Sequence, residues 1–203
     1  MDVLQRPKDF FSEEEISYLR ALSPWRAVWS LVHCWGVIFL TWGLVCIWTN
    51  PVTVIAAVFI IGARQLGLGV LSHDGAHFAL FENRKLNDWV CEWILSRPFT
   101  SGTIYGYRKY HLIHHANTQQ EDDPDLHLSR PFPISKSSFR RKVWRDLTGQ
   151  TGIKQYGGMF KDAFSGDTPW RAFRHGWHRF GGNIAINVAF LIGFALIGKW
   201  YLY

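Results

Sequence analysis

The stretch from Ala27 to Thr49 contains no charged side chain. A helix needs about 20 apolar residues to cross the hydrocarbon core of a bilayer, and this stretch exceeds that length. Tryptophans lie near both of its ends, at Trp29 and Trp48, and indole rings favour the headgroup level of a membrane. We therefore predict a transmembrane helix here.

A second apolar stretch follows almost at once. Asn50-Pro51 predicts a turn that starts a helix from Val52 to Leu71. This stretch contains Arg64, and a charged side chain is costly at the centre of a bilayer. We therefore expect Arg64 to lie near the interface and the helix to continue into water. The short turn makes the two helices an antiparallel hairpin.

The charged residues predict the orientation of this hairpin. The net charge is +6, and basic residues outnumber acidic ones in the long segment 72–180. Basic excess marks the cytoplasmic side of a membrane, so we expect this segment and the N-terminus to be cytoplasmic. Topology and lipid headgroups account for the charge, and no nucleic-acid partner is expected, because no binding motif accompanies it.

A third uncharged stretch runs from Asn183 to about Gly198, before Lys199-Trp200-Tyr201. We therefore predict an all-α, multi-pass integral membrane protein. It would comprise an N-terminal cytoplasmic segment (1–24), a transmembrane hairpin (25–72), a cytoplasmic or interfacial histidine-rich helical region (73–182) and a third transmembrane helix (183–203). Two aromatic and charged stretches in the third of these parts are expected in the interface plane: Trp89–Leu95 and Trp170–Phe180.

Histidines form two clusters in the region between the hairpin and the third helix. His73 and His77 are spaced i, i+4, which places both rings on one helix face. His111, His114 and His115 are spaced i, i+3, i+4 and share another face. Neutral imidazole is a good ligand for iron, zinc and copper. The two clusters together therefore predict a metal site, whereas either alone would also suit surface histidines.

The remaining sequence narrows the class of metal site. A zinc protease needs His-Glu-x-x-His, and Asp74 follows the first histidine instead. Soluble carboxylate-bridged di-iron proteins use Glu-x-x-His pairs, and the chain contains none. These exclusions leave a metal site that is built chiefly from imidazoles and lies at a membrane surface.

His-x-x-x-His after a hydrophobic hairpin, then His-x-x-His-His, resembles the membrane fatty acid desaturase family, the histidine-box di-iron proteins. The resemblance covers about residues 25–200. It implies two iron ions, O2 as co-substrate and two electrons, which together introduce a double bond into an acyl chain. It also implies roles for individual residues. The expected metal ligands are His73, His77, His111, His114 and His115. Asp74 is the leading candidate to fix the tautomer of a ligand, followed by Asp122, Asp123 and Asp125.

The family also has a third histidine box, beyond a second hairpin. His175 and His178 form a His-x-x-His pair but precede the third apolar stretch, so we expect them to be interfacial, and His127 to be a loop residue. The expectation is then that this chain is an N-terminal fragment of a longer desaturase-like protein.

The resemblance implies an acyl substrate, delivered by membrane lipid or an acyl carrier, and an electron donor of ferredoxin or cytochrome b5 type. The basic run Arg140–Lys142 suits such an acidic donor, although lipid phosphate explains it better. A related hydroxylase or carotenoid ketolase would use the same boxes. A membrane electron-transfer protein that binds haem through His33 and another histidine, or a catalytically silent truncated membrane protein, would also be compatible with the apolar stretches.

Overall fold

The computed structural model describes residues 6–99 and 102–203, and this part of the chain contains helices and no β-strand. The all-α prediction is confirmed. The bounds of the helices are η1 Pro7–Asp9, α1 Glu13–Arg20, α2 Pro24–Ile47, α3 Pro51–Ala76, α4 Arg84–Val90, the π-helical turn η2 Cys91–Ser96, α5 Arg97–Phe99, α6 Ile104–Asn117, α7 Leu126–Ser129, α8 Lys136–Leu147, α9 Gln150–Ala163, α10 Pro169–Leu196 and η3 Trp200–Leu202.

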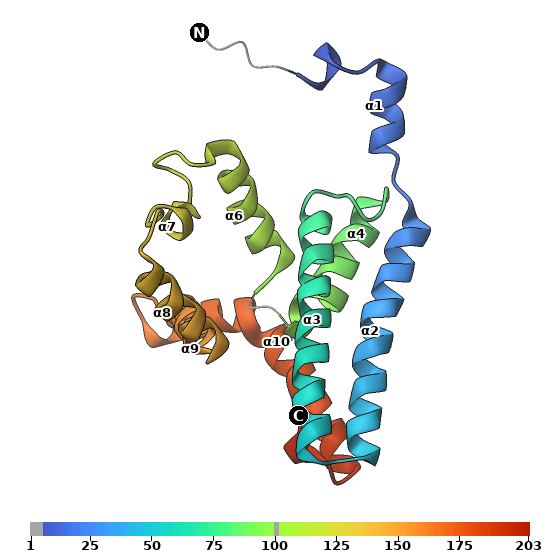
Figure 1. Cartoon of the computed structure of the whole chain (residues 1–203), viewed down its shortest axis with the longest axis vertical. Coiled ribbons are helices and arrows are strands. Elements are labelled where there is room, and N and C mark those ends of the chain that lie inside the picture. Colours follow the sequence, from blue (N-terminus) through green and yellow to red (C-terminus); the bar gives the residue numbers. More distant parts are fainter. Residues whose placement is uncertain (1–5, 100–101) are drawn as a thin grey trace.

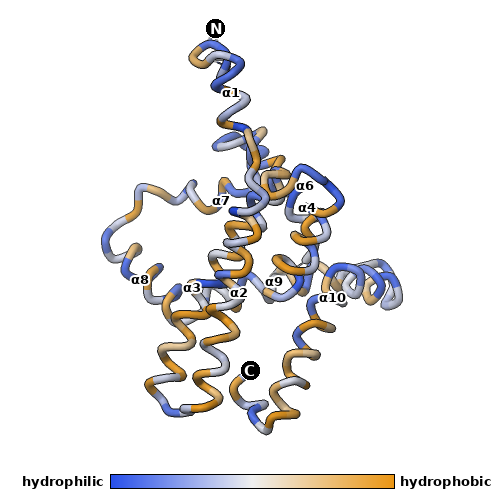
Figure 2. Tube along the Cα trace, turned by 90° about the vertical axis from the view of Figure 1, so that its right-hand side faces the viewer, coloured by the Kyte–Doolittle hydropathy of each residue, from blue (hydrophilic) through white to orange (hydrophobic). Residues whose placement is uncertain are grey.

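Within the described part of the chain, three helices are long and apolar enough to cross a membrane, namely α2, α3 and α10. In Figure 2 their hydrophobic lengths lie at one end of the molecule, while α1 and much of the connecting chain are more hydrophilic. This arrangement is the one expected of a membrane protein whose polar part stands on one side of the bilayer.

Helices α2 and α3 form the predicted antiparallel hairpin (Figure 1). The Asn50 side chain caps α3 by accepting hydrogen bonds from the backbone N–H groups of Val52 and Thr53, at 3.0 and 3.1 Å. At a rise of 1.5 Å per residue, the 26 residues of α3 extend about 39 Å, which exceeds the roughly 30 Å of a hydrocarbon core. The excess length allows the last turn of α3 to stand outside the membrane.

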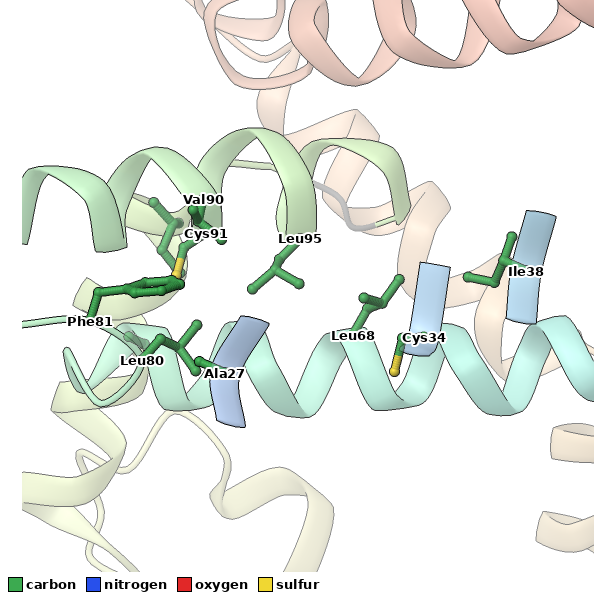
Figure 3. Close-up of a cluster of buried hydrophobic side chains, with 11 residues drawn as sticks. Ala27, Cys34, Ile38, Leu68, Leu80, Phe81, Val90, Cys91 and Leu95 are labelled. Carbon is green, nitrogen blue, oxygen red and sulfur yellow. The ribbon is translucent and has the colours of Figure 1, made fainter. Parts of the chain in front are cut away.

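Helix α4, the turn η2 and α5 run alongside this hairpin and form a core with it (Figure 3). Cys91 and Leu95 are fully buried there, against apolar residues of the hairpin that include Leu68. The Trp35 indole of α2 donates a hydrogen bond to the carbonyl oxygen of Ile94, at 3.3 Å. We predicted an interfacial position for Trp89–Leu95. The structure packs one face of this stretch against the hairpin through Cys91 and Leu95, while Trp89 and Trp93 remain exposed, so the interfacial position stays a prediction.

Helix α10 joins two stretches that the sequence suggested as separate. It starts at Pro169, with the Thr168 side chain as its N-cap, and continues without a break through the third apolar stretch to Leu196. Figure 1 shows its first half beside α9, to one side of the hairpin, and its second half descending next to the hairpin. The helix ends before Gly198, whose φ of 69° is in the left-handed region that glycine adopts easily.

A buried polar network ties α10 to η2 and α6. The Arg97 guanidinium forms an ion pair with Glu92 at 2.7 Å and donates to the Asn183 side chain at 3.2 Å. The other carboxylate oxygen of Glu92 accepts the backbone N–H of Ile104 at 2.7 Å, at the start of α6. All three polar side chains belong to buried residues. The network therefore fixes where α6 leaves the core.

Candidate metal centre

The first histidine cluster lies at the C-terminal end of α3. His73 is in the last turn and His77 is the residue that ends the helix. The N–H of Ala79 reaches the carbonyl oxygen of Asp74 at 2.9 Å, a Schellman pattern that usually places glycine in the left-handed position. Here that residue is Phe78, with φ 57°. A non-glycine residue in this conformation costs of order 1 kcal/mol or more, so the surroundings of the first cluster stabilise an unfavourable turn.

The second cluster lies on α6. The Thr103 side chain caps this helix by accepting the N–H of Gly106 at 3.0 Å. His111 is buried, and its ring stacks on that of Tyr107 with centroids 5.3 Å apart and planes 10° from parallel. His115 follows one turn later. The helix therefore presents both rings toward the end of α3.

The two clusters converge. Nε2 of His111 lies 2.9 Å from Nε2 of His77 and 3.0 Å from Nε2 of His115. Four histidines offer ring nitrogens that all lie within 4.8 Å of one another: His73, His77, His111 and His115. Nitrogens bound about 2.1 Å from one ion lie roughly 3–4 Å apart. The spacing of this group therefore suits a shared transition-metal ion.

Hydrogen bonding alone does not explain this convergence. In a neutral imidazole a ring nitrogen is either a donor or an acceptor, yet Nε2 of His111 faces two other Nε2 atoms at hydrogen-bond distance. Nε2 of His111 carries either one N–H or one lone pair, so it can form a good hydrogen bond with only one of these two neighbours. Ring nitrogens gathered this closely on four histidines are the donor set of a metal site, and the group fits such an ion.

Electrostatics keeps the centre of the group neutral. Burial and the neighbouring histidines lower the pKa of His111 to about 4. Burial and His73 likewise lower the pKa of His77. Both rings are therefore unprotonated near pH 7. A metal ligand must be unprotonated, so ion binding at these two residues requires little displacement of protons.

His114 is placed differently from the other four predicted ligands. Its Nδ1 lies 2.7 Å from Oδ1 of Asp123 and 3.7 Å from Asp125, and it is not a member of the four-histidine group. The hydrogen bond with Asp123 raises the pKa of His114. If Nδ1 carries the proton, Nε2 keeps its lone pair, which is the arrangement that carboxylates impose on metal-binding histidines.

Asp123 is the best-held carboxylate of the predicted acidic run. It is buried, and it accepts the backbone N–H groups of Gln119 and Asp125, each at 2.8 Å. Although burial acts to raise its pKa, the hydrogen bonds from His114 and from these two N–H groups lower it. Asp125 instead accepts the Tyr110 hydroxyl at 2.6 Å.

Asp74 lies beside the group. Its Oδ1 is 3.2 Å from Nδ1 of His73, and both side chains are partly exposed. This is the contact expected of a carboxylate that fixes the tautomer of a neighbouring ligand. Asp122 is exposed on the loop.

Other predicted histidine positions lie outside the group. Nδ1 of His175 bonds to the carbonyl oxygen of Ala163 at 2.9 Å, and His178 is exposed on α10. His127 is exposed and contacts the carbonyl oxygen of Pro124 at 3.0 Å. His33 is exposed on α2. Among residues 6–99 and 102–203, no second group of three or more histidine, cysteine, aspartate or glutamate side chains converges in this way.

Sequence reasoning missed two sets of residues that position the site. One is the buried Glu92–Arg97 pair, for which the signal was two opposite charges inside an aromatic stretch. The other is Arg108, one turn before His111, which contacts backbone carbonyls at the end of α3. Its partners are main-chain atoms, so no spacing of side chains could reveal it.

Comparison with known proteins adds one finding. Residues 48–203 match a family model described as fatty acid desaturase. A search of curated proteins and a search of solved structures each gave no match. The match spans both histidine clusters and all of α6–α10.

Proposed function

We propose, from the premise that this chain belongs to the fatty acid desaturase family, that it introduces a double bond into an acyl chain with histidine-bound iron, O2 and two electrons. Membership makes the chain a desaturase-like oxidoreductase of a membrane-bound, generally di-iron family. The observation that carries the finer proposal is the convergence of His77, His111 and His115 through Nε2 atoms 2.9 and 3.0 Å apart.

The reaction requires a metal because no acid or base of the protein can remove hydrogen from an unactivated methylene. Bound iron would supply the activation of O2 for that step. Two hydrogens leave the acyl chain, and with two electrons and two protons they reduce O2 to two waters. The donor for the electrons is proposed to be of ferredoxin or cytochrome b5 type.

The residues of the chain have distinct proposed roles. The four converging histidines hold one ion, and burial keeps His111 ready to bind it without losing a proton. His114, with Nδ1 held by Asp123, is a proposed ligand for the second ion of a di-iron centre. Asp74 orients His73 from the other side. These carboxylates accept hydrogen bonds from ring N–H groups of the ligands and need not touch the substrate.

The position of the site supports an acyl substrate. Both clusters lie at the polar end of the hairpin, where α3 is longer than a bilayer core is thick. A lipid acyl chain or a carrier-bound acyl group can reach such a site from the membrane surface. We propose that this surface is cytoplasmic, because the basic residues lie on the same side.

Iron content and product analysis test the proposal. The variants His111→Ala and His115→Ala should each lower iron bound to the purified chain and abolish desaturation. His127→Ala is the matched control, since His127 is exposed and lies outside the group, and it should change neither. Unchanged iron in His111→Ala would reject the ligand assignment.

The same experiment separates the related chemistries. Products from acyl lipids distinguish desaturation from hydroxylation, and products from carotenoids would indicate a ketolase. A haem absorption band that disappears in His33→Ala would contradict the proposal. Iron bound with no product from any of these substrates would indicate a silent member of the family.

A further inference from the structure

The carbonyl groups at the end of α3 lie between the two histidines of the first cluster. The last four carbonyls of a helix have no partner within the helix. Backbone N–H groups of the following turn reach Asp74 and Gly75, and the Asn87 side chain also donates to the carbonyl oxygen of Gly75, at 2.9 Å. Side chains from elsewhere in the fold thus help to fix this end.

Arg108 of α6 supplies the most extensive of these contacts. Its Nε donates to the carbonyl oxygen of Ala76 at 2.9 Å, and its Nη2 donates to that of Gly75 at 3.1 Å. The same guanidinium pairs with Asp88 of α4 and lies 3.9 Å above the centre of the Phe78 ring. One side chain therefore contacts the last turn of α3, the left-handed turn after it, and α4.

Apolar packing does not hold the histidine-bearing half of α6 in the same way. The buried residues of α6 are Ile104, at its far end, and His111 itself. Leu112 and Ile113 remain 46% and 41% exposed. The Arg108 side chain is only 12% exposed and lies one turn before His111. It is therefore placed to fix α6 against α3 at the level of the metal site.

We propose that Arg108 is a positioning residue, which holds α3 and α6 in the register that brings His77 and His111 together. A shift of one residue along a helix is about 1.5 Å, enough to break the two carbonyl contacts and to separate nitrogens now 2.9 Å apart. The planar guanidinium suits this role because it donates in several fixed directions, which an ammonium group does not. The inference rests on the proposed metal-binding function.

Cobalt(II) binding to the purified chain in detergent micelles tests this inference. Arg108→Met should weaken Co²⁺ binding about tenfold or more, the usual effect of losing a residue that orients ligands, and should change the Co²⁺ absorption bands. Lys109→Met is the matched control, because Lys109 is the next residue, carries the same charge and is exposed. It should leave affinity and bands unchanged.

Two further variants separate positioning from general stability. Arg108→Lys should recover part of the affinity, and Asp88→Asn should weaken binding less than Arg108→Met does. The double variant Arg108→Met/Asp88→Asn should be no weaker than Arg108→Met, since both changes remove one unit. A residue with only a structural role would reduce the amount of folded protein and leave the Co²⁺ bands of the remainder unchanged, and that result overturns the inference.

Hydrogen exchange of the metal-free protein provides an independent measurement. Backbone amides of residues 104–117 should exchange faster in Arg108→Met than in Lys109→Met. If Arg108→Met does not fold, Arg108→Lys and Asp88→Asn carry both tests. Absence of Co²⁺ binding in the unmodified chain counts against the proposed function. Hydrogen exchange still tests the positioning role without metal. Equal exchange rates of residues 104–117 in Arg108→Met and Lys109→Met overturn that role.

Discussion

Gly75 lies between the two histidines of the first cluster, where α3 packs closely against Cys91 of η2. A Cβ atom added at Gly75 would lie 1.9 Å from Sγ of Cys91 and 3.3 Å from the Leu80 side chain. Ordinary carbon–sulfur contact needs a distance nearly twice as long, so the two backbones would have to separate by about 2 Å. Cys91 is fully buried within the hydrophobic core, and protein cores are close-packed with few voids.

We therefore predict that Gly75→Ala lowers the free energy of unfolding by about 1–3 kcal/mol, the usual cost of overpacking a core. Alanine favours helix over glycine by up to about 1 kcal/mol, so the clash must exceed that gain. For a chain of this size, each kcal/mol shifts Tm by about 2–4 °C. The same displacement should also lower bound iron, since it moves His73 and His77.

Thermal unfolding in detergent measures this effect, and two variants make it specific. Gly69→Ala is the control, because a Cβ atom there meets nothing within 4 Å, and its Tm should stay equal or rise. Cys91→Ala removes the clashing sulfur and leaves a Cβ contact of 3.5 Å. The double variant Gly75→Ala/Cys91→Ala should therefore have a Tm close to that of Cys91→Ala alone. The packing explanation is refuted if Gly75→Ala is as stable as Gly69→Ala, or if Cys91→Ala gives no rescue.

Two further predictions concern the carboxylates. Glu92→Gln should destabilise the protein by about 3–5 kcal/mol, because it leaves the buried Arg97 charge unpaired. Glu92→Met/Arg97→Met should unfold at a higher temperature than Glu92→Gln, and an equal or lower Tm would contradict this reasoning. Asp123→Asn should reduce bound iron about tenfold, since it weakens the hold on His114. It should also speed hydrogen exchange in residues 118–125, and unchanged exchange would show that Asp123 does not order that loop.

The sequence predicted the hairpin well, because its causes are local. An uncharged stretch of membrane length and an Asn-Pro cap both act within a short part of the chain, and Asn50 does cap α3. The continuity of α10 was harder to predict. Its first half is charged and its second half is apolar, yet no residue between them interrupts the helix.

The candidate site could be predicted only in part. Spacing within each histidine cluster defines a helix face, and His73, His77, His111 and His115 do converge. Spacing does not determine which faces meet, because the path from α3 through η2 to α6 decides that. This path depends on contacts between distant residues, such as Arg97 with Asn183, and on backbone carbonyls that accept from Arg108.

The most direct test of the account is iron X-ray absorption of the purified chain and of one variant from each cluster. We predict imidazole scattering from nitrogens about 2 Å from iron, with loss of iron or of imidazole signal in both His77→Ala and His115→Ala. Iron that keeps the full imidazole signal in either variant, or that is bound only by oxygen or sulfur, would show that the two clusters do not share a metal.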